Sequence, residues 1–113
     1  MEHLLEVLSR YRFSLSTEIE LKNEMEAVLI QHSIPFIREH RLDSKNILDF
    51  YIGKIGVEVK IKGAAKSTYK QCERYCQFSE VEQLLLVTNK AHGMPSIINN
   101  KKIHVLRLGS AWL

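Results

Sequence analysis

The apolar residues in the first third of the chain recur at the spacing of an α-helix. Residues 3–12 predict a short helix, and residues 17–32 predict a longer one that Ser16 or Thr17 would cap. Two carboxylates, Glu18 and Glu20, fall in the first turn of the longer helix. Its buried stripe is expected to consist of Leu21, Met25, Val28 and Leu29.

After Pro35 the pattern changes to short apolar runs and to alternation, which are typical of β-strands. The chain has a helical composition again after Gly63, and residues 92–96 have the composition of a loop. The order helix, three strands, helix, two strands predicts an α/β fold with a central mixed sheet flanked by helices. The predicted strands are residues 35–42, 48–52, 55–61, 84–90 and 102–108, and the predicted helix between the third and fourth is 64–78.

The second and third predicted strands are joined by Gly53-Lys54, which suits a two-residue hairpin turn with glycine first. That turn pairs Phe50 with Val57 and places Asp49 directly opposite Glu58. Because side chains alternate faces along a strand, Asp49, Glu58 and Lys60 share one face. The opposite, core face is expected to hold Leu48, Phe50, Ile52, Ile55, Val57 and Val59.

Two carboxylates placed opposite each other need an explanation. Like charges across strands are destabilising, and a desolvated carboxylate costs free energy unless it is paired or bound to a cation. Lys60 offsets only one of the two charges, whereas Mg²⁺ is typically held by one or two carboxylates, waters and substrate phosphates. The alternative is an exposed Asp49 in an ordinary ion pair with Lys60 or Lys62. The hairpin pattern alone leaves both interpretations open.

Asp49 followed nine residues later by Glu58-Val59-Lys60, both flanked by apolar strand residues, resembles the signature of the PD-(D/E)XK nucleases. This superfamily includes restriction endonucleases, Holliday-junction resolvases and small virus-type replication-repair nucleases. The resemblance extends over about residues 17–108. TEIEL resembles the family's leading helix, FIREHRLDSKNILDF the strand and link before the aspartate, and YKQCERY a Gln-x-x-Arg-Tyr stretch on the following helix. Leu48 stands where the named motif has proline.

The resemblance implies a restriction-endonuclease-like core and a metal-dependent nuclease that hydrolyses DNA phosphodiester bonds. It implies Mg²⁺ as the cofactor, and hard carboxylate ligands would also accept Mn²⁺. Lys60 would orient or deprotonate the attacking water, or steady the pentacovalent phosphate. Gln71 would contact substrate phosphate or water at the edge of the site. The implied metal ligands are Asp49 as the bridging ligand, Glu58, the carbonyl of Val59, and Glu18 on the leading helix.

Glu18 is preferred over the neighbouring acids because it shares a helical face with Leu21, Met25 and Leu29. Glu20 and Glu24 project elsewhere. Cys72 and Cys76 lie four residues apart on the later helix, but a zinc or iron–sulfur site normally needs four ligands, so both are expected to be small buried residues.

Basic residues recur every four positions on the helix after the hairpin. They form either an ordinary solvated face or, beside a metal site, a track for a phosphate backbone. The nucleic-acid-binding residues predicted on this basis are Lys62, Lys66, Lys70 and Arg74, with Lys90, Lys101 and Lys102 as possible extensions.

The composition adds little to this interpretation. The 113 residues, net charge of +3 and 45% hydrophobic content predict one globular domain, 1–113, in which residues 1–15 form an N-terminal helical extension. Apolar runs are too short to span a bilayer and no cleavage-site pattern follows the N-terminus, so an intracellular, cytoplasmic protein is expected.

So small a nuclease is expected to act as a homodimer. The apolar contact would come from Leu4, Leu5 and Leu8, or from Trp112 and Leu113. Two other functions stay open: cleavage of Holliday junctions or other branched DNA, and, in a different class, a non-catalytic nucleic-acid-binding or assembly module with a nuclease fold.

Overall fold

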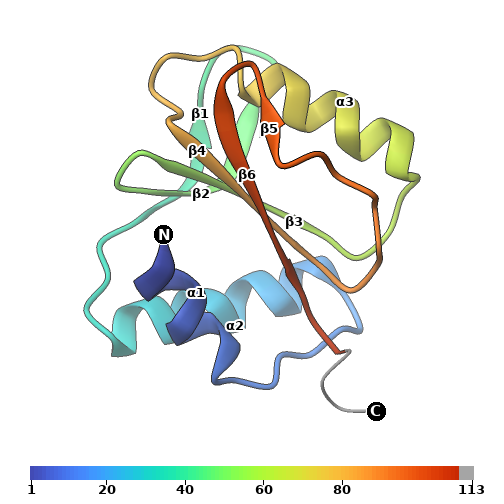
Figure 1. Cartoon of the computed structure of the whole chain (residues 1–113). Coiled ribbons are helices and arrows are strands. Elements are labelled where there is room, and N and C mark those ends of the chain that lie inside the picture. Colours follow the sequence, from blue (N-terminus) through green and yellow to red (C-terminus); the bar gives the residue numbers. More distant parts are fainter. Residues whose placement is uncertain (110–113) are drawn as a thin grey trace.

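A mixed β-sheet lies between two layers of helix in the computed structural model of this chain, which describes residues 1–109 (Figure 1). Helices α1 and α2 cover one face of the sheet, and α3 covers the other (Figure 1). The elements are α1 Glu2–Ser9, α2 Glu18–Gln31, β1 Ile37–Arg41, β2 Ile47–Ile52, β3 Ile55–Lys60, α3 Ala65–Tyr75, β4 Gln83–Thr88, β5 Ile97–Ile98 and β6 Lys101–Arg107. The predicted mixed α/β architecture is therefore confirmed.

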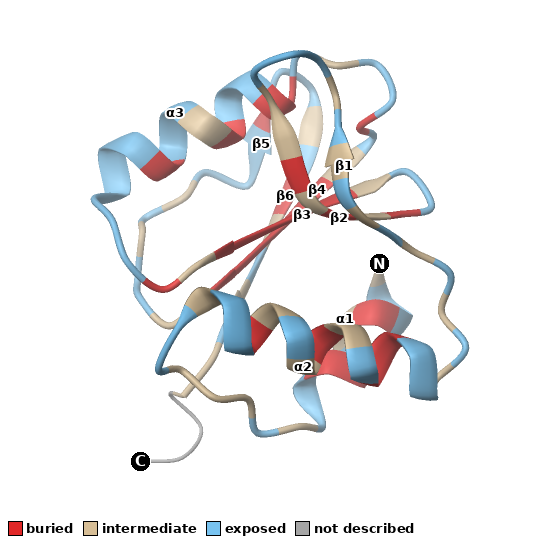
Figure 2. Cartoon of the chain, turned by 180° about the vertical axis from the view of Figure 1, so that it is seen from behind, coloured by how far each residue is buried: buried red, intermediate tan, exposed pale blue. Residues whose placement is uncertain are grey.

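The six strands lie in the order β1-β2-β3-β4-β6-β5. Strands β1, β2 and β3 form an antiparallel meander, while β4 runs parallel to both β3 and β6. Helix α3 supplies the crossover from β3 to its parallel neighbour β4, as parallel pairing requires. Of the three adjacent parallel strands, β3 and β4 lie at the centre of the sheet, and Figure 2 shows both as mostly buried between the helical layers.

Strand β5 was not predicted from the sequence. Residues 97–98 pair with Lys101-Lys102 at the start of β6, across a two-residue turn. Asn99 and Asn100 both have positive φ, 50° and 64°. Asparagine is among the residues that tolerate this conformation, and positive φ at both central positions defines a type I′ hairpin turn. The Asn-Asn pair was therefore the available signal for this strand.

The N-terminal layer is built as the apolar pattern predicts. Thr17 caps α2, because its hydroxyl accepts a hydrogen bond from the amide of Glu20 at 3.1 Å. The predicted stripe of Leu21, Met25, Val28 and Leu29 is buried against the sheet together with residues of α1. Leu4 and Leu8 are 4% and 1% exposed. They pack within their own chain and offer little surface to a partner, whereas Leu5 is only partly buried, so a dimer contact of this segment stays a prediction.

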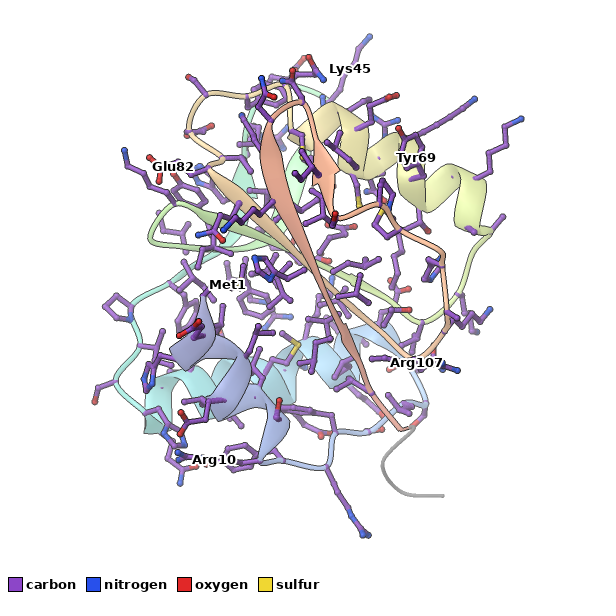
Figure 3. The ribbon with its side chains drawn as sticks, viewed as in Figure 1. Met1, Arg10, Lys45, Tyr69, Glu82 and Arg107 are labelled. Atoms are coloured by element: carbon purple, nitrogen blue, oxygen red, sulfur yellow. The ribbon has the colours of Figure 1, made fainter. Side chains whose placement is uncertain are left out.

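The layer on the other face packs around α3. Cys72 and Cys76 are buried free thiols there, as predicted, and burial raises the pKa of Cys72 to about 12. Tyr75 is the largest buried side chain of this layer. Figure 3 shows the side chains of both layers filling the space between helices and sheet; Tyr69, labelled on α3, is exposed.

The hairpin register is the predicted one over its first three pairs, which are Ile52 with Ile55, Tyr51 with Gly56, and Phe50 with Val57. Gly53 has a φ of 61°, which glycine adopts readily. Leu48 does not share the face of Phe50. It packs in the α3 cluster, where its methyl groups occupy the space above Gly56. A Cβ added to Gly56 would lie only 3.0 and 3.2 Å from them. The face prediction for Leu48 is wrong because the alternation of faces is interrupted between Leu48 and Phe50. The β2–β3 pairing ends at Phe50, and Glu39, which stands opposite Asp49 on β1, has a φ of 54°.

Within residues 1–109, no helix is long and apolar enough to cross a membrane. Trp112 and Leu113, the second predicted source of a dimer contact, lie outside the described residues.

Candidate metal and phosphate site

Asp49 takes the place of a backbone partner at the point where the β2–β3 ladder stops. The last printed pair of that ladder is Phe50 with Val57. Two residues further along β3, the amide of Val59 donates to Asp49 Oδ2 at 2.7 Å. The side chain of Asp49 therefore satisfies an amide that a regular ladder would have given to a carbonyl, and this bond holds the carboxylate against β3.

Glu18 does the same for the next amide on that edge of β3. The N–H of Ile61 donates to Glu18 Oε2 at 3.0 Å. Val59 and Ile61 are two residues apart, about 6.6 Å along a strand, and their amides point to the same side of β3. Asp49 and Glu18 therefore bind successive amides on that side. The N–H and C=O of a strand residue point to the same side, so the carbonyl of Val59 faces the same edge.

Glu58 is nearly inaccessible, at 4% exposure, and it lies on the α3 side of β3. Burial raises its pKa, the negative charge of Asp49 raises it further, and the result is about 9. A hydrogen bond between the two carboxyl groups contributes to the upward shift, while Lys60 and Tyr75 oppose it. The Asp49 and Glu58 carboxyl groups therefore interact, but the direct Asp49–Glu58 pair predicted for the hairpin is not in the register, because the ladder ends at Phe50 and Val57. Without a bound cation Glu58 takes up a proton at neutral pH.

Lys22 is a member of this site that the sequence did not predict. Its ammonium lies 3.3 Å from Asp49 Oδ1 and 3.5 Å from Glu39 Oε1. Burial lowers the pKa of Lys22, but attraction to these two carboxylates outweighs burial and the net shift is upward. Lys22 follows Glu18 by one helical turn, so α2 places both residues beside the β2-facing side of β3, where Glu18 accepts from Ile61 and Lys22 pairs with Asp49. The expected pairing of Asp49 with Lys60 or Lys62 is not the one formed.

Tyr75 links Glu58 to α3 and to β2. Its hydroxyl lies 3.2 Å from Glu58 Oε1 and 2.9 Å from the carbonyl of Ile47, and it accepts a hydrogen bond from Gln71 Nε2 at 2.8 Å. A phenol has one hydrogen to donate. Glu58 and the Ile47 carbonyl therefore share that hydrogen as alternative acceptors. A bond from Tyr75 to Glu58 stabilises the carboxylate form, which is why Tyr75 opposes the upward shift of the Glu58 pKa.

Lys60 and Gln71 border a basic hollow of about 320 Å³ beside the carboxylate pair. Lys60 Nζ lies 3.8 Å from Glu58 Oε2. The hollow is formed by the end of β3, the link after it and one face of α3. Its lining residues are Lys60, Lys62, Gly63, Ser67, Lys70, Gln71 and Arg74.

Of the four predicted nucleic-acid-binding residues, the hollow brings together Lys62, Lys70 and Arg74 but not Lys66. Each step of four residues turns about 40° beyond a full helical turn, so the stripe of basic residues drifts around α3. Lys101, one of the possible extensions, instead donates its ammonium to the carbonyl of Phe78.

The carboxylate pair suits a hard divalent cation by its chemistry, because both groups are oxygen donors and a cation could take the place of the proton on Glu58. Asp49 and Glu58 would hold such an ion, and the Val59 carbonyl faces their edge. Glu18 is engaged by Ile61 instead. Residues 1–109 contain no group of three or more His, Cys, Asp or Glu side chains gathered to hold a metal. The set that the structure brings together is thus smaller than the predicted one. Glu20 and Glu24 bind serines of the preceding loop, as their predicted direction requires.

No family model matches the chain, and no significant match is found among curated proteins or among solved structures.

Proposed function

We propose that this chain is a metal-dependent nuclease with a restriction-endonuclease-like core, and that it hydrolyses phosphodiester bonds of DNA. The observation that carries the proposal is the meeting of Asp49 and Glu58 beside Lys60 at the rim of a basic hollow. An acidic pair that can hold a cation, next to a surface that can hold phosphate, is the combination that phosphodiester hydrolysis needs. The order of elements, with the aspartate on β2 and Glu-x-Lys on β3, also supports it.

Each residue then has a definite task. When bound, Mg²⁺ polarises a phosphoryl oxygen and makes a coordinated water nucleophilic near neutral pH. Asp49 and Glu58 hold the cation, and Tyr75 and the Val59 amide hold the two carboxylates in place. Lys60 directs its ammonium toward the reacting phosphate or, as the neutral amine, takes a proton from the attacking water. Gln71, fixed by Tyr75, contacts the substrate from α3.

A second candidate is a non-catalytic nucleic-acid-binding module. Two observations favour it. The Lys22 ammonium balances the charge of Asp49, and the upward shift of the Glu58 pKa leaves Glu58 neutral, so no metal ion is needed to offset the buried charges. This module would keep the basic hollow and lack the metal.

The deciding experiment is incubation of the purified chain with plasmid, single-stranded and four-way-junction DNA in Mg²⁺, in Mn²⁺ and in EDTA. We expect metal-dependent cleavage by the unaltered chain and none by Glu58→Gln. Glu82→Gln is the matched control, because Glu82 is an exposed acid that pairs only with Lys54 among the described residues. Preferential cutting of the junction would favour the branched-DNA activity. Cleavage equal in the two variants would mean a contaminating nuclease, and binding without cleavage would favour the module.

A further inference from the structure

The basic hollow has the features of a discrete anion site rather than of a solvated face. Three of its lining side chains are lysines and one is an arginine, and no carboxylate lines it among the described residues. Neither Lys62 nor Lys70 has a side-chain partner within residues 1–109. Cations that converge on a concave surface without counter-charges leave a strong positive potential, because such a surface focuses the field.

Arg74 is held so that most of its donors are free for a ligand. Its Nε donates to Asn46 Oδ1 at 3.2 Å. The amide of Asn46 is itself oriented by Asp43, whose Oδ1 accepts from Asn46 Nδ2 at 3.0 Å. A guanidinium has five N–H donors in a rigid fork, so the remaining donors keep a fixed direction. This arrangement preorganises Arg74 for an oxyanion, which guanidinium binds through two parallel hydrogen bonds.

The floor of the hollow also leaves room for a bulky anion. Gly63, between β3 and α3, has a φ of 106°, and a Cβ added there would meet no atom within 4 Å. The hollow holds about 320 Å³, which accommodates one phosphate group with its attached sugar oxygens and no folded partner. Lys60, the residue assigned to the reacting phosphate, is one of the residues that line the hollow.

We propose that this hollow is a single phosphate-anchoring subsite, which binds one backbone phosphate of the nucleic acid next to the bond that is cut. Only the position of the subsite next to a bond that is cut rests on the proposed nuclease function. The subsite itself can bind nucleic acid without hydrolysis. It differs from a continuous basic track along α3, because Lys66 belongs to the track and lies outside the hollow.

The test measures binding in EDTA, where no metal-dependent cleavage occurs. Fluorescence anisotropy with a labelled single-stranded oligonucleotide and its duplex gives the affinity at several salt concentrations. We expect Lys62→Ala and Lys70→Ala each to weaken binding several-fold and to reduce the slope of log K against log salt by about one, the change for one lost phosphate contact. Lys66→Ala should leave the slope unchanged. Lys54→Ala, an exposed lysine at the opposite end of β3 that pairs with Glu82, controls for net charge.

A second measurement locates the anchored phosphate. Single neutral methylphosphonates are placed at successive positions of an oligonucleotide that is held in one register by a blocked end. A methylphosphonate at one position should abolish the difference in binding affinity between the unaltered chain and Lys70→Ala. Methylphosphonates at the other positions should preserve that difference. Equal effects of Lys66→Ala and Lys70→Ala, or an effect spread evenly over all positions, would overturn the subsite. Hollow-dependent binding without cleavage in Mg²⁺ would retain the subsite and reject the nuclease. Metal-dependent cleavage at the unaltered rate by Lys62→Ala and Lys70→Ala would retain the nuclease and reject the subsite.

Discussion

Lys22 Nζ lies 3.3 Å from Asp49 Oδ1, although 27 residues separate the two along the chain. The two side chains are only 16% and 13% exposed, so solvent screens the pair little. The ammonium supplies Asp49 with the positive charge that a divalent cation would otherwise provide. A cation that binds Asp49 therefore has to displace Lys22 or share the carboxylate with it.

Replacing Lys22 by methionine should strengthen Mn²⁺ binding and weaken the metal-free fold. Methionine retains the length of the side chain but leaves Asp49 without its ammonium, at a cost of about 1–3 kcal/mol for an incompletely satisfied buried group. Ion binding then recovers that energy, so the rise in melting temperature on adding Mn²⁺ should exceed that of the unaltered chain. Calorimetric titration and thermal melting measure both effects, with Lys54→Met as control. An unchanged Mn²⁺ affinity would show that Lys22 does not compete for Asp49.

Stability in EDTA should fall as the pH rises from about 5 to about 9. The pKa of Glu58 in the folded chain is raised to about 9 from its ordinary value of 4.5. Between these values the folded chain keeps a proton that the unfolded chain has lost, so unfolding is favoured by higher pH, with a slope of up to about 1.4 kcal/mol per pH unit.

The slope of the unfolding free energy against pH should be strongly reduced in Glu58→Gln, where a neutral amide replaces the protonated acid. Added Mn²⁺ should also reduce it, because the cation competes with the proton and binds better as the pH rises. Urea denaturation followed by circular dichroism at a series of pH values gives the slope directly. An identical slope in Glu58→Gln and the unaltered chain would assign the pH dependence to other groups.

The parts of this fold that the sequence predicts are those encoded locally. Thr17 with the apolar stripe of α2, and Gly53-Lys54 with its flanking alternation, each need only a few neighbouring residues to specify a helix start or a hairpin. The signature residues also meet because Asp49 and Glu58 belong to one hairpin. Lys22 and Tyr75 join the site from helices at other places in the chain, and no local pattern marks a lysine or a tyrosine as a partner of a distant carboxylate. Leu48 was misplaced for a related reason, since the ladder around Asp49 is interrupted and the Asp49 side chain, not a backbone carbonyl, accepts from Val59, which the alternating pattern does not reveal.

Asp49→Asn should separate metal binding from folding. The amide oxygen can still accept from Val59, and removing one negative charge relieves the repulsion of Glu58, but Lys22 loses its charged partner. Because these effects oppose each other, the unfolding free energy in EDTA should fall by less than the loss of about 1–3 kcal/mol expected for Lys22→Met. The pKa of Glu58 should move down toward its ordinary value. Mn²⁺ affinity and DNA cleavage should both be lost, because a neutral amide is a poor ligand for a hard cation. Calorimetry and cleavage are measured side by side, and cleavage at the unaltered rate would reject the proposed site.

Tyr75→Phe should act through Glu58 rather than through packing alone. The missing hydroxyl removes a partner from Glu58, from the Ile47 carbonyl and from Gln71, at a cost of about 1–3 kcal/mol. Because the Tyr75 hydrogen bond lowers the pKa of Glu58, its loss should move the pH dependence of Mn²⁺ binding to higher pH. Cys76→Ala, a buried truncation in the same cluster, controls for loss of packing. A loss of stability with an unshifted pH profile would leave Tyr75 a packing role only.

Lys60→Ala and Lys60→Arg together should reveal what the lysine does in the proposed reaction. The Lys60 ammonium lies 3.8 Å from Glu58 and is 27% exposed, so its removal should leave the fold and Mn²⁺ binding largely intact. Turnover should nevertheless fall by about 10²-fold or more, the range for losing a positioned acid–base group. Arginine retains the positive charge but does not give up its proton. Rescue of cleavage by arginine would therefore identify Lys60 as a stabiliser of charge on the phosphate, while failure of both variants would identify it as the base for the attacking water. Full turnover by Lys60→Ala would remove Lys60 from the reaction altogether.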